Sequence, residues 1–239
     1  MVKIRTVSET KREFHVHHNR PINSIYRRFV EELMIEMHLL TVHVDFLYDP
    51  IYALGVVTSF ERFMQGYRPE TDKDSIFNAI CQSVGADFQQ YKQNATDVVT
   101  AAQSIEMSDF MSKITAVSPE SAGDNYFFQT LANIKQNSNF KYSRLFAIGL
   151  YTLLSTVDPE LTKEEEKRNQ VLSQVAEALN LSNEKIQKDL DLYRSNLEKA
   201  DQFLKVLDEA MEADRKKREK QAQTANSGSS STEAPSEAS

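Results

Sequence analysis

The chain has 239 residues, enough to bury a substantial core, but only six glycines and six prolines. Sandwiches, barrels and nucleotide-binding α/β folds need many glycine-dependent turns, so this composition disfavours them and predicts an all-α fold. A net charge of −7 argues against nucleic acid as the main partner, and a single cysteine, Cys81, excludes an internal disulfide and a thiolate-cage metal site.

The sequence predicts no secretory signal peptide and no transmembrane segment. Its longest apolar run, residues 145–154, falls well short of the ~20 residues that a bilayer requires. Residues 1–14 lack the apolar core of a secretory signal. We therefore expect any contact with a membrane to be peripheral.

The first predicted helix starts at Ile22 and runs to Leu40. Pro21 suits its first turn, where a missing N–H costs nothing, and the charged side chains fall largely on the opposite side. Apolar residues recur at steps of three and four, the signature of a helix with a broad buried stripe. The stripe consists of Ile22, Ile25, Tyr26, Phe29, Val30, Leu33, Met34, Met37 and Leu40.

Residues 10–40 hold four of the five histidines, which raises the question of a metal site. His15, His17 and His18 are crowded before the first predicted helix, but zinc needs three or four ligands held in a fixed geometry. The chain contains neither an HExxH motif nor the Glu-x-x-His pair of di-iron bundles. We predict no metal site and interpret these histidines as capping or surface residues.

Residues 48–69 carry signals for both ends of the next helix. Asp49 is a natural N-cap, Pro50 fits the first helical position, Gly66 can adopt the left-handed conformation at the end, and Pro69 blocks continuation. Further helices follow, the first of which ends at Gly85. Their predicted ranges are about 72–84, 87–102, 108–117 and 124–135, with a loop at 117–125.

Residues 145–154 are apolar nearly all round, as in a central helix that its neighbours bury. Gly149 lies inside this helix and Gly55 inside an earlier one, where glycine costs up to ~1 kcal/mol relative to alanine. We interpret both glycines as marking a close helix crossing. The Asp158-Pro159 pair breaks the central helix.

Two more helix starts are predicted towards the C-terminus. Thr162 and Glu165 have the spacing of a capping box, which would open a helix that ends at Asn180. Ser182 can cap the last helix, which we expect to run to about Gln221.

The last helix carries apolar residues at alternating steps of four and three, which is an a/d heptad seam. Leaving such side chains in water would forgo ~1.5–3 kcal/mol each, so the seam is expected to dock. Its own body and a partner helix both remain possible. The seam consists of Ile186, Leu190, Tyr193, Leu197, Ala200, Leu204, Leu207 and Met211.

A compact basic cluster, residues 215–220, follows the seam. Cations near a helix C-terminus are favoured by the helix dipole, so the cluster can be purely structural. It can also contact anionic lipid or an acidic partner. The Ser-rich and Glu-rich composition after it predicts a disordered tail.

No catalytic constellation is visible in the sequence. Cys81 follows an apolar helix face and is interpreted as a small buried hydrophobe. No two glycines stand close enough for a phosphate-binding loop, and adjacent acidic residues such as Glu31 and Glu32 cannot face each other as an acid/base couple. We predict that the protein is not an enzyme.

The order of short motifs over residues 10–85 carries a family resemblance. "TKR.F", "RPINSIY", "EELM", "HLL", "YDP..ALG" and "GY" follow one another with little slack. In this stretch the chain resembles the thylakoid formation protein family of photosystem II biogenesis. The chain begins near the family core and lacks a Ser/Arg-rich transit peptide, which suggests a cyanobacterial member.

The resemblance implies an all-helical, non-enzymatic auxiliary protein at the cytoplasmic side of the thylakoid membrane. It implies binding and stabilisation of FtsH-type membrane protease complexes and a contact with photosystem II assembly intermediates. We expect no bound cofactor, although the resemblance leaves chlorophyll association open. The alternatives are a chlorophyll or small-ligand carrier, a peripheral lipid-surface protein and a metal-dependent enzyme.

We therefore predict a helical body at 1–180, a long and partly protruding C-terminal helix at 181–221, and a tail at 222–239. Two groups of residues are candidates for partner binding. The first group consists of residues in the family motifs that helix formation alone does not require: Arg20, Asn23, Tyr48, Asp49, Gly66 and Tyr67. Helix capping also explains Asp49 and Gly66. The second group lies on the last helix: Leu197, Leu204, Leu207, Met211, Arg215, Lys216, Lys217 and Arg218.

Overall fold

The computed structural model describes residues 5–118 and 126–228, and over these ranges the chain forms helices and no β-strand. The elements are α1 (Val7–His17), α2 (Ser24–Thr41), α3 (Pro50–Phe63), α4 (Asp72–Ser83), α5 (Phe88–Gln103), α6 (Met107–Thr115), α7 (Tyr126–Gln136), α8 (Arg144–Val157), the 3₁₀ turn η1 (Pro159–Thr162), α9 (Glu165–Ala178) and α10 (Asn183–Gly228). The prediction of an all-α fold is confirmed.

The chain divides into two compact units, Met1–Ser195 and Asn196–Ser239. The first unit, called the body from here on, contains α1 to α9 and the first turns of α10. The second unit continues α10. Ile186, Leu190 and Tyr193, the first three members of the predicted seam, are buried in the body. The body therefore extends beyond residue 180, because the seam begins to dock as soon as α10 starts.

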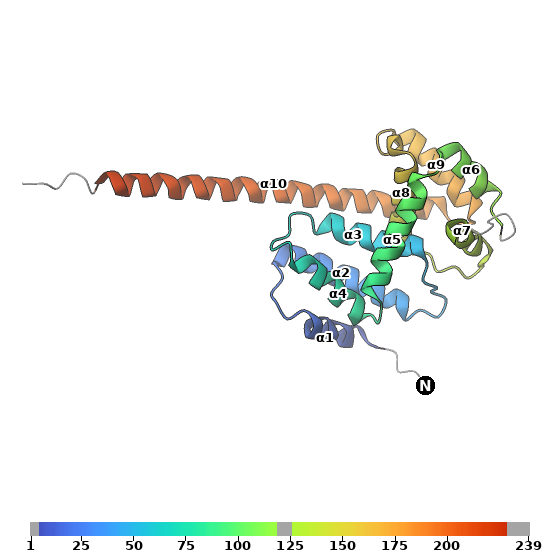
Figure 1. Ribbon diagram of the computed structural model, residues 1–239, viewed down its shortest axis with the longest axis horizontal. Coiled ribbons are helices and arrows are strands. Elements are labelled where there is room, and N and C mark those ends of the chain that lie inside the picture. The colour runs from blue at the N-terminus through green and yellow to red at the C-terminus, as the bar shows by residue number, and fades with distance from the viewer. Residues whose placement is uncertain (1–4, 119–125, 229–239) are drawn as a thin grey trace, which may run out of the picture. The chain divides into compact units, whose positions relative to one another are not determined.

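The centre of the body is the crossing of α3 with α8, and α5 packs against both helices (Figure 1). Gly55 and Gly149 lie at this crossing. A Cβ on Gly55 would lie 1.7 Å from the carbonyl oxygen of Leu145, and one on Gly149 would lie 1.8 Å from that of Ile51. The predicted close crossing and the predicted burial of the central helix are confirmed.

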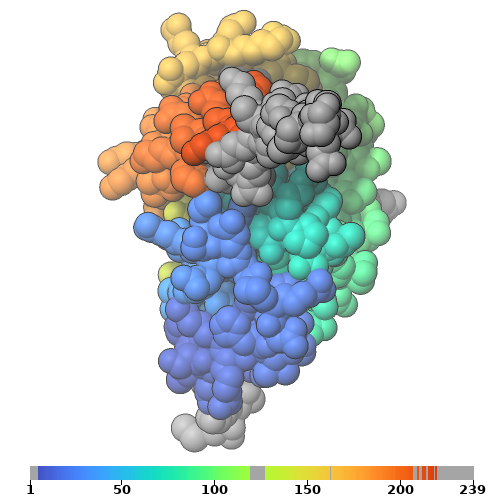
Figure 2. Space-filling view, turned by 90° about the vertical axis from the view of Figure 1, so that its left-hand side faces the viewer, coloured from blue at the N-terminus to red at the C-terminus, as the bar shows by residue number. Residues whose placement is uncertain are grey.

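Helices α1, α2 and α4 pack together, and on the face shown in Figure 2 the side chains of α1 and α2 form one continuous surface. The sequence interpretation did not predict α1. Its start is nevertheless encoded, because Thr6 and Glu9 form a capping box: the Glu9 N–H donates to Thr6 Oγ1 at 3.2 Å, and the Thr6 N–H donates to Glu9 Oε2 at 2.8 Å.

The predicted start of α2 is wrong by two residues. Asn23 is the N-cap, and its Oδ1 accepts a hydrogen bond from the Ile25 N–H at 3.1 Å, so Pro21 precedes the helix instead of lying in its first turn. Ile25 belongs to the predicted buried stripe, and this prediction is wrong because its side chain is exposed. The stripe becomes effective from Tyr26 onwards.

Most of the other predicted ends are confirmed. Asp49 Oδ1 accepts from the N–H groups of Ile51 and Tyr52 at 2.9 and 2.8 Å. Gly66 and Gly85 have φ angles of 78° and 77°, and Asn180, where α9 was predicted to stop, has φ 58°. The Ser182 hydroxyl accepts from the Lys185 N–H at 3.4 Å and caps α10.

The start of α9 predicted at Thr162 is wrong, because the N-cap of α9 is Glu164, without a side-chain hydrogen bond, and Thr162 belongs to η1. The physical reason is that Asp158 already caps that turn, because its Oδ1 accepts from the Glu160 N–H at 3.0 Å. The side chain of Thr162 lies outside the described part of the chain. The predicted break at Asp158-Pro159 is confirmed, since α8 ends at Val157.

The helices predicted at 108–117 and 124–135 correspond to α6 and α7, which pack against each other, and α6 also contacts α9. Most of the loop predicted between them, together with Asp124 and Asn125, lies outside the described residues. Helix α10 continues to Gly228, past the expected end near Gln221, so the tail predicted from residue 222 overlaps the helix up to 228. The remainder of that tail lies outside the described residues.

Candidate partner-binding surface

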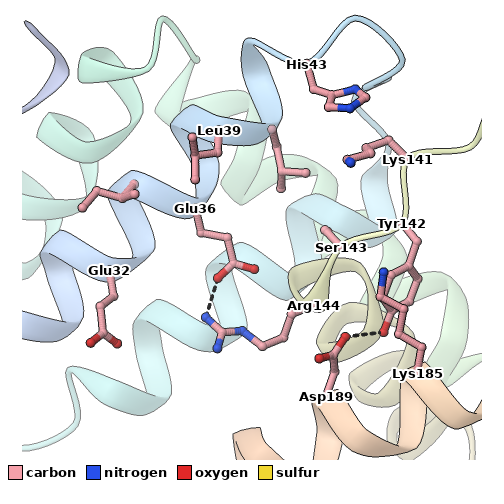
Figure 3. Close-up of a pocket in the computed structure, with 12 residues that line it drawn as sticks. Glu32, Glu36, Leu39, His43, Lys141, Tyr142, Ser143, Arg144, Lys185 and Asp189 are labelled. Atoms are coloured by element: carbon pink, nitrogen blue, oxygen red, sulfur yellow. Dashed lines mark hydrogen bonds and ion pairs between the residues drawn. The ribbon is translucent and has the colours of Figure 1, made fainter. Parts of the chain in front are cut away.

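A groove with a volume of 760 Å³ lies in the body between the second half of α2, the segment before α8 and the first turns of α10 (Figure 3). Its lining combines apolar side chains with both signs of charge. The lining residues are Glu32, Ile35, Glu36, Leu39, Leu40, His43, Lys141, Tyr142, Ser143, Arg144, Lys185 and Asp189. Three segments far apart in the sequence therefore share this surface, which we call the α2/α10 groove.

Several of the charged residues that line the groove make polar contacts within it. Arg144 Nη2 donates to Glu36 Oε2, and the Tyr142 hydroxyl donates to Asp189 Oδ2 at 2.8 Å (Figure 3). Lys185 Nζ lies 4.7 Å from the centroid of the Tyr142 ring, a cation–π contact. These contacts hold the walls of the groove in a fixed arrangement.

Burial governs the protonation of two of these groups. The pKa of Glu36 is raised because the carboxyl is buried, although the Arg144 guanidinium opposes the shift. Burial and then the hydrogen bond to Asp189 raise the pKa of the Tyr142 hydroxyl. Tyr142 is therefore a neutral donor at physiological pH.

Three large apolar side chains are exposed at the end of α2 and in the link between α2 and α3. Leu39, on the last turns of α2, is 55% exposed and also lines the groove. In the α2–α3 link, Val44 is 92% and Leu47 is 65% exposed. We call Leu39, Val44 and Leu47 the α2–α3 apolar patch. Covering it would recover up to ~1.5–3 kcal/mol for each side chain.

The structure gives structural roles to the predicted residues near α2. Arg20 donates to Asp72 Oδ1, which joins the entry of α2 to the first turn of α4, while its side chain stays 59% exposed. Asn23 caps α2. The predicted contact of Arg20 and Asn23 with a partner stays a prediction, and of the two only Arg20 also pairs with a buried carboxylate.

The other four residues of the first group lie in and around α3. The Tyr48 hydroxyl accepts a hydrogen bond from Asn94 Nδ2 at 2.9 Å, and Asp49 is the buried N-cap. Gly66 forms the turn after α3, and the Tyr67 ring is buried edge-on against Tyr26 at 5.1 Å. Their partner contact also stays a prediction, because packing and capping already account for their positions.

The second predicted group belongs to the second unit. Leu197 and Leu204 are half-buried, whereas their neighbours Phe203 and Val206 are 41% and 62% exposed. The side chains of Leu207, Met211 and Arg218 lie outside the described part of the chain. The apolar surface of this stretch is thus wider than the predicted seam.

At the basic end of α10, the described cations pair along the helix. Lys216 Nζ lies 2.9 Å from Glu212 Oε1, and Arg215 Nε lies 3.6 Å from Glu219 Oε1, both at i,i+4 spacing. Lys217 is exposed. Such surface pairs contribute ~0.3–0.5 kcal/mol each, so both cations remain available to an anionic partner.

Sequence reasoning missed the α2–α3 apolar patch and the groove. A signal for the patch was present, because Leu39 falls outside the predicted stripe, and Val44 and Leu47 fall in no predicted helix. The groove had no signal, because it depends on the juxtaposition of α2, the segment before α8 and α10.

The candidate chemical residues have ordinary environments. Cys81 is fully buried, as predicted, and burial raises the pKa of its thiol to about 12. His18 occupies the C-cap position of α1, as one part of the capping-or-surface interpretation expects, and its side chain is buried, with Nδ1 3.0 Å from Ser75 Oγ. That interpretation is wrong for His38, which is buried inside α2 with Nδ1 3.0 Å from Thr10 Oγ1. Among the described residues, no three His, Cys, Asp or Glu side chains are grouped so that they could hold a metal ion. Within the same ranges, no helix combines the length and the apolar character that crossing a bilayer requires.

Comparison with known proteins agrees with the motif order in residues 10–85. The family model described as thylakoid formation protein matches residues 6–222. Protein Thf1 of Gloeothece citriformis is 59% identical over 221 residues, which cover 92% of this chain and 98% of that protein. Protein Thf1 of Synechocystis sp. is 56% identical over 222 residues, covering 93% and 92% respectively.

A solved structure of Psb29 superposes with a TM-score of 0.79 at 43% sequence identity, covering 90% of this chain and 98% of that one. Sequence motifs, family model and fold therefore agree. The chain belongs to the thylakoid formation protein family.

Proposed function

We propose that the protein is a non-enzymatic adaptor in photosystem II biogenesis and repair, which binds and stabilises FtsH-type protease complexes from the cytoplasmic side of the thylakoid membrane. Membership of the thylakoid formation protein family over residues 6–222 supports the cellular setting. Photosystem II assembly intermediates are further proposed partners.

The α2–α3 apolar patch is the observation that carries this proposal. Protein–protein interfaces have an apolar core surrounded by a polar rim. Leu39, Val44 and Leu47 supply exposed apolar area, and the α2/α10 groove beside Leu39 supplies polar groups. Because the Arg144–Glu36 pair is already formed, a partner would meet an ordered surface and less conformational entropy would be lost on binding.

Affinity purification from thylakoid-enriched membranes tests the adaptor function. The intact chain should recover protease subunits, and V44S/L47S should recover at least tenfold less while its circular dichroism and thermal midpoint stay unchanged. Val16, on α1, is 69% exposed and lies outside the patch, so V16S is the matched control and should behave as wild type. If the intact chain recovers no protease subunit, the adaptor proposal is wrong.

A chain ending at Ser195 separates the two candidate surfaces. It keeps Ile186, Leu190 and Tyr193, which complete the body, and it lacks the rest of α10. Full recovery of the protease by this chain would assign the contact to the body. Loss of recovery with an intact body would assign it to the second unit, with Leu197, Leu204 and the basic end.

The basic end of α10, in the second unit, is the basis for a proposed peripheral membrane contact. The cations at 215–220 are suited to an anionic lipid surface. Flotation with anionic liposomes should then be salt-sensitive and should be lost when Arg215, Lys216 and Lys217 are replaced by glutamine. Flotation that persists in this variant would remove the basic end from the membrane contact.

The α2/α10 groove is also the observation that favours a second candidate function, a carrier of chlorophyll or a small ligand. Its volume lies within the ~300–1,000 Å³ of small-molecule sites, and its apolar side chains adjoin one imidazole, His43. A carrier should retain visible absorbance after chlorophyll is offered and the excess is removed. His43→Ala should lower the retained absorbance, and absorbance equal to that of a non-binding control protein would exclude this function.

A further inference from the structure

A second, smaller cavity, with a volume of 320 Å³, lies between α1 and the first half of α2. Part of its lining is formed by core side chains: Phe14 is 4% exposed, and Val30 and Met34 are each 1% exposed. This volume is at the lower end of the range for small-molecule sites. These three side chains present little surface to the cavity, and its more accessible apolar lining comes from Pro21, which is exposed, and Ile22, which is half-buried. The cavity is of a size that suits a short chain or a single ring.

The rest of the lining is rich in cations. Lys11 Nζ lies 3.0 Å from Glu31 Oε2, and Arg27 Nε lies 4.0 Å from Glu31 Oε1, so two cations share one carboxylate. Arg20 also lines the cavity and is neutralised by Asp72. One positive charge of the Lys11–Arg27 pair is therefore left without a counter-charge from Glu31, although the chain as a whole carries −7.

The cavity collects residues on which the family resemblance rests. Lys11 and Phe14 come from "TKR.F", and Arg20, Pro21 and Ile22 come from "RPINSIY". The helix starts do not need them, because Thr6 with Glu9 caps α1 and Asn23 caps α2. The two motifs thus contribute side chains to one cavity.

We propose that this cavity binds a small amphiphile with one anionic group, a carboxylate or phosphate ester, and a short apolar chain. The anionic group lies against Lys11 and Arg27, which can donate charge-assisted hydrogen bonds. The chain lies over Pro21 and Ile22 and reaches the edge of the buried Phe14, Val30 and Met34 side chains. This inference goes beyond the adaptor function and does not depend on it.

The larger α2/α10 groove does not have these properties. Its guanidinium, that of Arg144, is held by the partly buried Glu36 carboxylate. The lining carboxylates Glu32, Glu36 and Asp189 are matched in number by the lining cations Lys141, Arg144 and Lys185, so this groove has no excess of positive charge for an added anion. The charge of the lining therefore favours the smaller cavity over the α2/α10 groove as the site for an anionic ligand.

Isothermal titration calorimetry on the full chain tests the proposal with three probes. Octanoate carries both features of the proposed ligand, octanol carries only the apolar chain, and inorganic phosphate carries only the charge. We expect saturable one-to-one binding of octanoate, with octanol and phosphate at least tenfold weaker. No saturable binding of octanoate, or equal binding of octanol, would overturn the proposal.

Adjacent arginines on α2 provide matched variants. Arg27 and Arg28 each pair with a glutamate four residues later, and Arg27 lines the cavity whereas Arg28 does not. R27Q should weaken octanoate about three- to tenfold, and R28Q should leave the affinity unchanged. K11Q/R27Q leaves Glu31 facing the ligand alone and should abolish saturable binding, with the circular dichroism of each variant confirming that it folds. Equal losses in R27Q and R28Q would show a non-specific charge effect and would contradict the site.

Methyl NMR locates the ligand. The Met34 methyl signal should shift on addition of octanoate with the same dissociation constant as the calorimetry, and the methyl signal of Met111, on α6, should not. Shifts confined to residues outside the cavity would overturn the assignment. Vesicles with and without anionic lipid then separate the two sources of the ligand: R27Q lowers vesicle binding if the anion is a lipid headgroup and leaves it unchanged if the anion is a free molecule.

Discussion

Replacing Gly55 by alanine adds one methyl group at the centre of the body, where no side chain can move to accept it. The new Cβ would lie 1.7 Å from the Leu145 carbonyl oxygen and 2.8 Å from the Gly149 nitrogen. Even close C–H···O contacts between helices have C···O distances of ~3.3–3.6 Å. Helices α3 and α8 would therefore have to separate by about 1.5–2 Å.

The energetic cost of this separation exceeds the gain in helix propensity. Alanine is better than glycine inside a helix by up to ~1 kcal/mol. Against this, a radial gap of only ~0.5–1 Å removes a quarter to a half of the dispersion energy of each contact across it. Both facing surfaces are buried over most of their length. We expect G55A to lower the free energy of unfolding by ~3 kcal/mol or more, out of the ~5–15 kcal/mol typical of a domain.

Urea unfolding followed by circular dichroism measures this loss, and the thermal midpoint should fall by ~6–12 °C. Gly85 is the matched control, since it has φ 77° and a Cβ there would meet nothing within 4 Å. G85A should cost only the ~1–2 kcal/mol of a left-handed residue.

The reciprocal change completes the test. G149A places a Cβ 1.8 Å from the Ile51 carbonyl oxygen, and the same separation of the helices relieves both clashes. G55A/G149A should therefore lose much less than the sum of the single losses. A G55A protein as stable as wild type, or strictly additive losses, would refute the idea that a single close crossing organises the body.

Three further predictions concern pH, the groove and α10. Burial raises the pKa of Asp49 to about 7, although hydrogen bonds from the N–H groups of Tyr52 and Ile51 oppose the shift, so the folded state binds a proton more tightly than the unfolded one. The resulting stabilisation is present below about pH 4 and is lost as the pH rises through about 7. D49N, which keeps the cap, should reduce the dependence of the unfolding free energy on pH, measured by urea unfolding. E36Q removes the charge opposite the partly buried Arg144 and should lower the free energy of unfolding by ~1–2 kcal/mol, whereas E32Q, at the exposed pair with Arg28, should change it by no more than ~0.5 kcal/mol. Equal effects of the two variants would contradict a structural role for the Glu36–Arg144 pair. Y193A should lower the unfolding free energy of the body by ~3 kcal/mol and V206A by less than ~0.5 kcal/mol, because Tyr193 is 6% and Val206 is 62% exposed.

Much of the helical architecture could be predicted because it depends on local signals. Asp49, Gly66 and Gly85 mark helix ends through their own hydrogen bonds or φ angles. Gly55 and Gly149 could also be interpreted correctly, since a glycine inside a buried helix needs a reason and close approach is the commonest one.

The misses have two physical origins. Helix α1 buries only Thr10 and Phe14, so it lacks a long apolar stripe, and the Thr6 and Glu9 capping box is its main sequence signal. Thr162 and Glu165 have the spacing of a capping box, but Asp158 and Pro159 start a 3₁₀ turn that includes Thr162. Two helix-start signals therefore overlap in this stretch, and the structure follows the earlier one in the sequence.

The candidate site could not be predicted in the same way, because it depends on long-range contacts. Figure 3 shows two contacts between residues far apart in the sequence: Glu36 on α2 pairs with Arg144 at the start of α8, and the Tyr142 hydroxyl donates to Asp189 on α10. No periodicity links these pairs. A sequence pattern reports how apolar residues are spaced within one helix and is silent on which segments come together.

The seam of α10 shows why exposure, and not periodicity, should guide the search for the partner. Its spacing continues unchanged from Ile186 to Met211, yet Ile186 is fully buried in the body, whereas the seam members Leu197 and Leu204 in the second unit are only half-buried. Beside them, Phe203 and Val206 lie outside the seam and are exposed. In the heptad register of the seam, these two residues occupy positions beside a and d, where a two-stranded coiled coil carries polar or charged side chains. Their apolar character widens the stripe to the breadth typical of a helix that packs on a globular surface or in a bundle. We therefore expect the second unit to be covered by a broad protein surface in preference to a single copy of the same helix. Sedimentation analysis of the full chain should accordingly give a monomer, and a concentration-dependent dimer abolished by F203S/V206S would reverse this conclusion.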